Sequence, residues 1–139
     1  MILLDTNVIS ELVRPAPDPA VVGFLRQQLP DRIYTAAVCV AEIQYGLARM
    51  PAGRRRDDLT ARVAALLEIA FPNEILPFGG ECAVHYGEIR AYREAAGEPI
   101  TVEDAMIAAT SQAHGAVLAT RNLADFEDTG IQLVNPWTP

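Results

Sequence analysis

Short apolar runs alternate along the chain with longer stretches in which apolar residues recur every three or four positions. A short apolar run is typical of a buried strand, whereas the longer period is typical of an amphipathic helix. Their alternation predicts βα units stacked into a parallel sheet, so the expected fold class is α/β. The expected strands cover residues 2–4, 33–36, 75–78, 116–120 and 131–134.

Six helices are expected between and after these strands, the last of them capped by the hydroxyl of Thr101 and stopped by Gly115. The helices at 54–70 and 81–96 each carry an apolar stripe, and we expect the two to form an arm or hairpin beside the sheet. The other expected helices cover residues 7–13, 19–29, 38–49 and 102–114. The stripe residues are Leu59, Val63, Leu66, Leu67 and Ala70 in the first helix of the pair, and Val84, Ile89 and Tyr92 in the second.

Length and composition indicate one globular domain over residues 1–139. Half of the 139 residues are hydrophobic, which suits a single core. The chain shows no leader-like start and no uninterrupted apolar run of about 18 residues, so we expect a cytoplasmic protein without membrane contact. Cys39 and Cys82 lack CxxC spacing and are expected to be buried, reduced thiols.

The charged residues exclude several classes of chemistry. The net charge of -7 argues against broad, nonspecific adhesion to nucleic acid, although a local basic patch is compatible with it. All 11 positive residues are Arg, which removes Schiff-base and P-loop lysine chemistry. The densest basic segment is 54–56, with Arg49 just upstream. This segment is either a solvated turn and helix start or a contact for phosphate.

Three acids stand where a strand ends or where the next helix begins. Asp5 directly follows the first strand, at the edge where parallel sheets bind ligands, although by itself it can equally be a helix cap. Glu42 lies in the apolar helix at 38–49, where a buried carboxylate must be paired with an arginine, protonated or bound to a cation. Asp104 lies in the first turn of another apolar helix, while its neighbour Glu103 is expected to face solvent.

A fourth polar group follows the strand at 116–120. Asn122 comes just after this strand, and Asp125 follows one helical turn later. The topology predicts that Asp125 and the three acids above gather at one edge of the sheet. Carboxylates that lie about 4 to 6 Å apart repel one another by a few kcal/mol per pair, so a cation is needed to stabilise them.

The ligand set predicts a hard metal ion. Oxygen ligands suit Mg²⁺ or Mn²⁺, and zinc is disfavoured because His85 and His114 are expected to be structural or exposed. An ion of this kind in an open cleft makes hydrolysis of a phosphodiester the leading hypothesis.

The segments that carry these residues resemble the PIN-domain ribonucleases, and within them the VapC toxins of bacterial toxin-antitoxin pairs, particularly the FitB-like group. They have the order and spacing of that group and cover nearly the whole chain, whereas DTN alone would be a weak signal. The segments are LLDTNVISELVRP around Asp5, TAAVCVAEIQYGLARMPAGRRR around Glu42, PITVEDAMIAAT around Asp104 and LATRNLADFEDTGIQLVNPW at the end.

The resemblance implies a three-layer α/β/α sandwich around a mostly parallel sheet of about five strands. It further implies the toxin of a type II toxin-antitoxin system, an endoribonuclease that depends on Mg²⁺, with Mn²⁺ as a substitute. The implied partners are an RNA substrate, a second copy in a homodimer, and a VapB-like antitoxin in a larger hetero-oligomer.

Carried over by motif, Asp5, Glu42 and Asp104 are the implied metal ligands and catalytic acids, and Thr6 is the supporting hydroxyl beside the first acid. Many members of the family carry Asp just after the fourth strand, where this chain has Asn122. Either Asn122 contributes a neutral amide or Asp125 supplies a catalytic carboxylate, and a shared supporting role is favoured.

Two further groups near these motifs have implied roles. Arg121, beside the site, is a candidate either for phosphate contacts or for meeting the antitoxin, and so are Arg49 and the 54–56 segment. Glu11 matches the family's ISEL segment, and it either pairs with an antitoxin arginine or is an ordinary acid on the helix surface.

Three other functional classes share some of these sequence features. A receiver domain also gathers acids at strand ends but needs a lysine near its last strand, and this chain has none. A haloacid-dehalogenase-like phosphatase needs the same lysine and an Asp at the position of Asn7. The alternative from another class is a catalytically silent PIN-like module that only binds RNA or protein, against which the intact acids Asp5, Glu42 and Asp104 argue.

Overall fold

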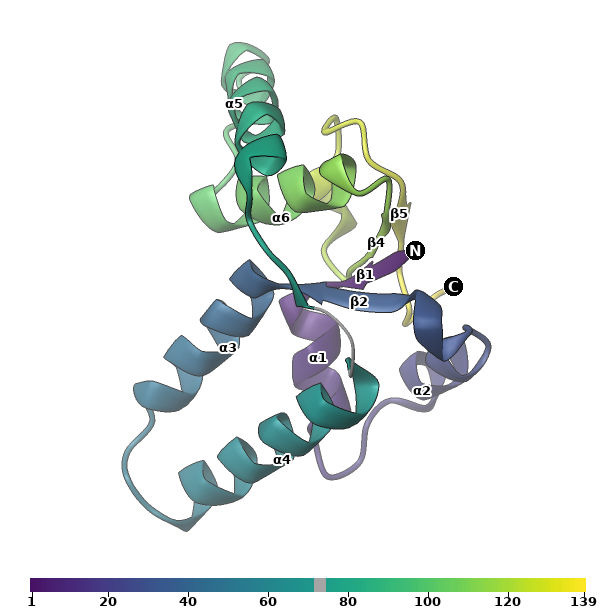
Figure 1. Cartoon of the computed structure of the whole chain (residues 1–139), viewed down its shortest axis with the longest axis vertical. Helices are drawn as coiled ribbons and strands as arrows, with labels where there is room; N and C mark the ends of the chain where they lie inside the picture. The colour runs from purple at the N-terminus through teal and green to yellow at the C-terminus, as the bar shows by residue number, and fades with distance from the viewer. Residues whose placement is uncertain (72–74) are drawn as a thin grey trace.

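Five short parallel strands form the centre of the protein, and helices cover both faces of the sheet (Figure 1). The computed structural model describes residues 1–71 and 75–139. The spatial order is β3-β2-β1-β4-β5, and each neighbouring pair is parallel. All five predicted strands are present, although the last three are shorter than predicted. They are β1 (Ile2–Leu4), β2 (Ile33–Ala36), β3 (Ile75–Leu76), β4 (Val117–Ala119) and β5 (Leu133–Val134).

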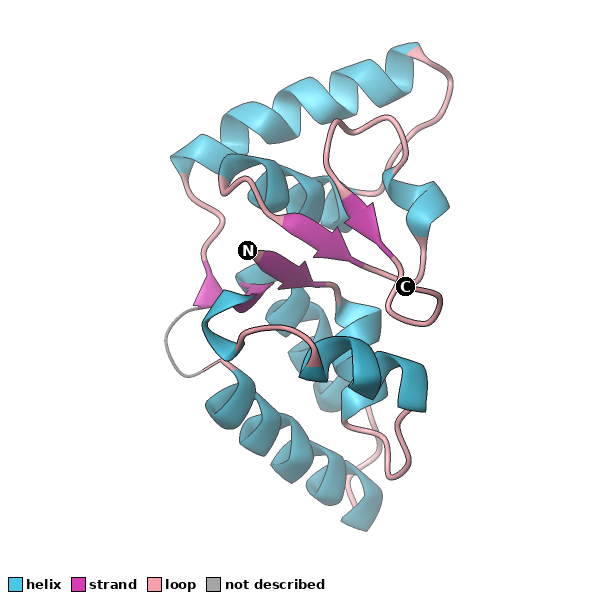
Figure 2. Cartoon of the chain, turned by 90° about the vertical axis from the view of Figure 1, so that its right-hand side faces the viewer, coloured by secondary structure: helices cyan, strands magenta, loops and turns pink. Residues whose placement is uncertain are grey.

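The helices form one layer on each side of the sheet (Figure 2). Helices α1 to α4 lie on one face, and α5 and α6 lie on the other. This arrangement confirms the predicted three-layer α/β/α sandwich. The helices are α1 (Thr6–Leu12), α2 (Pro19–Arg26), α3 (Ala37–Ala48), α4 (Arg54–Ala70), α5 (Gly80–Ala95) and α6 (Val102–Ala113), with short 3-10 turns η1 (Pro30–Arg32) and η2 (Leu123–Phe126).

The order of the strands creates a switch point between β1 and β4. After β1 the chain builds β2 and β3 on one side, and it then returns to build β4 and β5 on the other. The carboxyl ends of β1 and β4 therefore lie side by side, with Leu4 paired to Ala119. The hydrogen bonding between β1 and β4 extends one residue further, because the Asp5 N–H donates to the Ala119 carbonyl at 2.9 Å. Open parallel sheets bind ligands at such switch points.

Leucines of the two central strands form the middle of the core. Leu3, Leu4 and Leu118 have at most 1% of their surface exposed. Leu3 and Leu4 are consecutive, so they point to opposite faces of the sheet, and helices cover both faces. This two-sided burial explains why the strands are continuous apolar runs in the sequence.

Helices α4 and α5 do not form the predicted arm or hairpin. α4 packs with α3 on one face of the sheet, whereas α5 packs along α6 on the other (Figure 1). Strand β3 lies between them in the chain, so the chain changes layers there. The predicted stripe is correct for α4, where Val63 is buried, but in α5 only Ile89 is, and Val84 and Tyr92 are 62% and 61% exposed.

The ends of α6 follow the predicted capping residues. The Thr101 hydroxyl oxygen accepts the Asp104 N–H at 3.1 Å, which confirms the cap. Gly115 follows the helix with a φ of 61°, a conformation that favours glycine. The helix expected over 19–29 is shorter and ends at Arg26, because the chain turns there toward η1 and β2.

Both cysteines are buried and free, as predicted. Burial raises the pKa of the Cys39 thiol to about 12, so this thiol stays protonated at neutral pH. Across residues 1–71 and 75–139, no helix combines the length and apolar character needed to cross a membrane.

Candidate active site

Asp5 lies at the switch point, where three groups donate hydrogen bonds to its carboxylate. The Thr6 N–H donates to Oδ1 at 2.7 Å, and the hydroxyl of Thr120 donates to Oδ2 at 2.7 Å. The Asn7 side-chain amide also donates to Oδ2, at 3.3 Å. Asp5 is only 5% exposed, yet it lines an open cleft. The helix-cap interpretation is therefore confirmed, and because Asp5 also lines the cleft, its role as a metal ligand stays a prediction.

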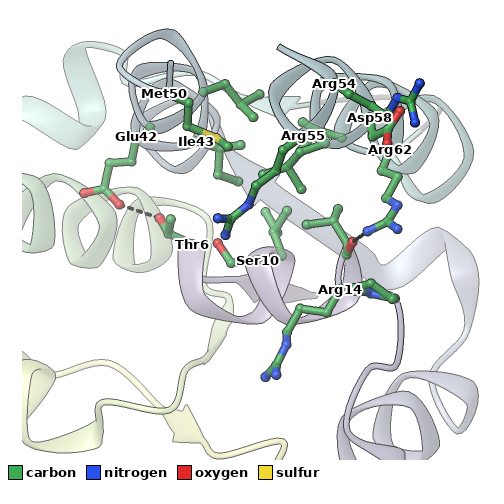
Figure 3. A pocket seen from close by; sticks show the side chains of 17 residues that line it. Thr6, Ser10, Arg14, Glu42, Ile43, Met50, Arg54, Arg55, Asp58 and Arg62 are labelled. Atoms are coloured by element: carbon green, nitrogen blue, oxygen red, sulfur yellow. Dashed lines mark hydrogen bonds between the residues drawn. The ribbon is translucent and has the colours of Figure 1, made fainter. Parts of the chain in front are cut away.

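Glu42 reaches the same cleft from the second turn of α3. The Thr6 hydroxyl donates to Glu42 Oε2 at 2.5 Å, and this bond joins the start of α1 to α3 (Figure 3). Glu42 is half-buried rather than enclosed, because α3 extends away from the sheet and leaves much of its surface exposed. In the described part of the chain Glu42 forms no ion pair with an arginine, which leaves protonation or a cation to compensate its charge.

Asp104 completes the group from the first turn of α6. It is half-buried and lines the cleft, while its neighbour Glu103 is exposed, as predicted. We call this cleft, which contains Asp5, Glu42 and Asp104, the acidic cleft; its volume is about 420 Å³. It is also lined by Thr6, Asn7, Ser10, Glu11, Arg14, Arg121, Asn122 and Trp137.

The carboxyls of the acidic cleft oppose one another's ionisation. Burial raises the pKa of Asp104 to about 6, a hydrogen bond with Thr101 offsets this in part, and the charges of Asp5, Asp125 and Glu42 add to the rise. Burial also raises the pKa of Asp5 and of Glu42, against the hydrogen bonds from Thr120 and Thr6. Burial, and to a smaller extent the neighbouring negative charges, disfavours the ionised carboxylates, and a bound cation would stabilise them.

Asn122 and Asp125 occupy different places beside the acids. Asn122 lines the acidic cleft, and its backbone N–H donates to the hydroxyl oxygen of Thr120 at 3.1 Å. Asp125 follows in η2 and does not line the cleft, but its negative charge raises the pKa of both Asp5 and Asp104. Of the two, only Asn122 therefore lines the acidic cleft, while Asp125 affects the acids through its charge.

The donor set fits a hard cation that keeps several water ligands. Among residues 1–71 and 75–139, no group of three or more Asp, Glu, His or Cys side chains is placed so that it could hold a metal ion together. Asp5 and Glu42 each also accept hydrogen bonds from neighbouring side chains, which occupies part of their capacity. Mg²⁺ usually binds through one or two carboxylates and retained water, so an incomplete cage of oxygen donors is compatible with it.

Three functional neighbours were not singled out from the sequence. Thr120 is fully buried and joins the ends of β1 and β4 by its bonds to Asp5 and Asn122. Asn7 bridges the same strands, because its side chain donates to Asp5 and accepts the Arg121 N–H at 3.3 Å. Trp137 lines the cleft from the C-terminal segment. The sequence could have indicated Thr120, since its hydroxyl ends an otherwise apolar strand. No sequence pattern indicated Trp137.

Glu11 is not the ordinary surface acid that was one of its two interpretations. It is 7% exposed, and its carboxylate accepts the Asp18 N–H at 2.9 Å and the Arg14 guanidinium at 3.1 Å. The hydrogen bond from Asp18 and the charge of Arg14 lower the pKa of Glu11. Glu11 therefore holds the loop between α1 and α2 in place, and its pairing with an antitoxin arginine stays a prediction.

A second hollow of about 930 Å³ lies between α1, α3 and α4 (Figure 3). We call it the helical groove. It meets the acidic cleft at a shared boundary formed by Thr6, Ser10, Arg14 and Glu42. Its apolar lining is Ile9, Val13, Ile43, Leu47, Met50, Leu59 and Val63, and its basic lining is Arg14, Arg54, Arg55 and Arg62.

The basic segment at 54–56 divides between two environments. Arg54 and Arg55 line the helical groove (Figure 3), whereas Arg56 donates to the Met50 carbonyl at 3.5 Å. Arg49 lies over the Tyr45 ring, with 5.6 Å from its guanidinium carbon to the ring centroid, and does not line the groove. Only part of the segment is therefore placed to meet a ligand there.

Comparison with known proteins identifies the family. The PIN domain model matches residues 2–131, so the chain belongs to the PIN domain family. The chain is 41% identical over 139 residues to the VapC ribonuclease Y4jK of Sinorhizobium fredii, covering 100% of this chain and 99% of that protein. It is 38% identical over 137 residues to Toxin FitB of Neisseria gonorrhoeae, covering 99% of each.

A solved structure of FitAB bound to an IR36 DNA fragment has the same fold. Its TM-score to this chain is 0.90 at 37% identity, with 100% of this chain and 97% of that chain covered. The resemblance to VapC and FitB-like toxins predicted from the motifs is thus confirmed over the full length of the described sheet and helices.

Proposed function

We propose that this protein is the toxin of a type II toxin-antitoxin pair and acts in the cytoplasm as an Mg²⁺- or Mn²⁺-dependent endoribonuclease. The observation that carries the proposal is the convergence of Asp5, Glu42 and Asp104 on one open cleft at the switch point of a PIN domain. Relatives named as VapC ribonucleases and as Toxin FitB, which match the whole chain, support it.

Each acid has a proposed task in the reaction. When bound, a divalent cation supplies a Lewis acid that acidifies water and stabilises negative charge on the phosphate. Asp5 and Asp104 would hold the ion, because both line the cleft, Asp5 directly after β1 and Asp104 in the first turn of α6. Glu42, oriented by Thr6, would complete the set or accept a proton from the attacking water. Asn122 would add a neutral amide, and Asp125 would strengthen the negative field.

The helical groove is the proposed binding site for a VapB-like antitoxin. Its apolar lining would take apolar side chains of the partner, while Arg54 and Arg55 would pair with acidic ones. Because the groove opens into the acidic cleft at Thr6 and Glu42, a segment bound there would reach the catalytic acids. The chain is similar to Toxin FitB, and similar solved structures are named FitAB and VapBC2, which supports a partner of this class.

The proposed assembly is a homodimer that joins its antitoxin in a larger hetero-oligomer. The measurement is the molar mass by light scattering, first for the free toxin and then for the reconstituted complex. A free toxin with the mass of one chain at micromolar concentration would contradict the dimer.

The second candidate function is a catalytically silent PIN module that binds RNA or protein. Inducing the wild type and Asp5→Asn in cells and mapping new RNA 5′ ends separates the two. Asn caps helices as well as Asp does, so the variant keeps the cap of α1 while it loses a carboxylate. We expect growth arrest and defined cut sites with the wild type only. Equal arrest without new RNA ends in both strains would favour the silent module.

A further inference from the structure

Arg121 and Trp137 form a stacked pair in the acidic cleft. The Arg121 guanidinium carbon lies 4.9 Å from the centroid of the Trp137 ring, within the range of a cation–π interaction. The two residues come from different segments, the turn after β4 and the C-terminal segment after β5. Both line the cleft that contains the three acids.

The indole is a fixed platform for the arginine. Trp137 is half-buried and packs against the main core, its neighbour Pro136 is buried, and its backbone N–H donates to the Asn135 side chain at 3.0 Å. The backbone of Arg121 is held as well, because its N–H donates to Asn7. Arg121 is exposed, its backbone is fixed by Asn7, and its guanidinium lies over the indole ring.

The hydrogen-bond donors of Arg121 are available to a ligand. Two arginines line the acidic cleft, and Arg14 forms an ion pair with Glu11 at 3.1 Å. Within residues 1–71 and 75–139, the Arg121 guanidinium donates no hydrogen bond and forms no ion pair. Stacking uses the flat face of a guanidinium and leaves its N–H edge open, which is the edge that binds phosphate oxygens.

We propose that Arg121 binds a backbone phosphate of the RNA next to the bond that is cut, and that Trp137 is the positioning residue that orients it. This inference rests on the proposed ribonuclease function and names the residue pair that grips its substrate. A phosphate is repelled by the acids of the cleft, so one oriented arginine at its edge decides where the RNA backbone can lie.

The test measures RNA affinity without cleavage. Antitoxin-free protein in EDTA binds a fluorescently labelled single-stranded RNA, and anisotropy gives Kd at several salt concentrations. We expect Arg121→Gln to weaken binding about tenfold and to lower the slope of log Kd against log salt by about 0.7, the value for one single-strand phosphate contact. Arg32→Gln is the matched control, since Arg32 is exposed at the opposite edge of the sheet and the variant has the same net charge.

A double-mutant cycle tests the positioning role. Trp137→Leu should weaken binding by nearly the same factor as Arg121→Gln, and the double variant should lose little more, because the two act as one unit. Trp137→Phe should restore part of the loss, since it keeps an aromatic face. Thermal unfolding of each variant shows whether the fold is intact, and the cycle is evaluated on folded protein.

Three results would overturn the inference. The first is an Arg121→Gln affinity and salt slope equal to those of Arg32→Gln, and the second is fully additive losses in the cycle. In either case a wild type that binds and cuts RNA leaves the ribonuclease function standing. A wild type that neither binds nor cuts RNA overturns both proposals.

Discussion

The acidic cleft and the helical groove lie side by side but are built from opposite chemistry. The acidic cleft gathers buried Asp5 and half-buried Glu42 and Asp104 at the carboxyl end of the sheet, where burial raises the pKa of all three. The helical groove is apolar with a basic rim and lies among helices away from the strands. The acidic cleft is therefore suited to binding a cation and to catalysis. The helical groove is suited to binding a protein segment that carries apolar and acidic side chains.

Helix α1 separates the two regions with its own two faces. Asp5 and Asn7 at its start face the acidic cleft, while Ile9 and Val13 face the helical groove. Thr6 belongs to both, because its hydroxyl bonds to Glu42 on their boundary. Catalysis and antitoxin binding can thus be changed separately by substitutions in the two regions.

The largest expected effect is on catalysis. Asp104→Asn keeps the shape of the side chain but removes a charge from the acidic cleft, so RNA cleavage should fall about 100-fold or more. Binding of the antitoxin, measured by calorimetry, should change by a much smaller factor, because Asp104 does not line the groove that would hold most of the partner. A variant that cuts RNA at the wild-type rate would contradict the role of Asp104.

The complementary change blocks the helical groove. Gly46 lies in α3 on the groove, and a Cβ there would meet no atom within 4 Å, so Gly46→Phe would fill the groove without a clash at its base. We expect the antitoxin Kd to rise at least about tenfold, or about 1.4 kcal/mol, while cleavage of RNA stays unchanged. Gly87→Phe is the matched control, an equally open helical glycine in α5. Equal antitoxin affinity in both variants would place the antitoxin elsewhere.

A smaller effect is expected at Thr120, which supports the acidic cleft alone. Thr120→Val conserves the shape but leaves Asp5 without one donor and the Asn122 N–H without its acceptor. We expect a loss of about 1 to 3 kcal/mol in the free energy of unfolding, measured with urea, and slower RNA cleavage with unchanged antitoxin binding. Thr120→Ser keeps the hydroxyl and should recover most of the activity; an inactive Ser variant would point to a packing role instead.

The smallest expected effect is the pH dependence of stability. The pKa of Asp104 rises from its ordinary value of 3.8 to about 6 in the folded protein, so the native state binds more protons between these values. The free energy of unfolding should therefore fall as the pH rises through this window, by about 1 kcal/mol after allowance for solvent screening. Asp104→Asn should lack this part of the pH dependence. If the free energy of unfolding depends on pH in the same way for both proteins, the pKa of Asp104 is not raised in the folded state.

The sequence predicted the fold well wherever local pattern decides the structure. The two-sided burial of Leu3 and Leu4 makes β1 visible as an apolar run, and the hydroxyl of Thr101 marks the start of α6. The pairing of α4 with α5 was wrong, because a helical stripe shows that a face is apolar but not which layer covers it. The prediction that Val84 and Tyr92 belong to a packed stripe failed for the same reason, since both are exposed.

The acids of the site were visible because strand ends converge at one edge of a parallel sheet. Asp5 and Asp104 could therefore be brought together from the sequence alone. Trp137 could not, since its contact with Arg121 depends on how the C-terminal segment packs beside β4. The burial of Glu11 could not be predicted either, because its carboxylate accepts a hydrogen bond from a loop whose path no local pattern specifies.

The proposed cleavage of RNA requires a divalent ion held in the acidic cleft. The most direct measurement is the cleavage of a labelled RNA by antitoxin-free protein in Mg²⁺, after addition of EDTA, and after Mn²⁺ is restored, with Asp104→Asn in parallel. We expect cleavage in Mg²⁺, no cleavage in EDTA, recovery with Mn²⁺, and almost no cleavage by the variant under any of these conditions. Full cleavage in EDTA, or equal cleavage by the variant, would contradict this requirement.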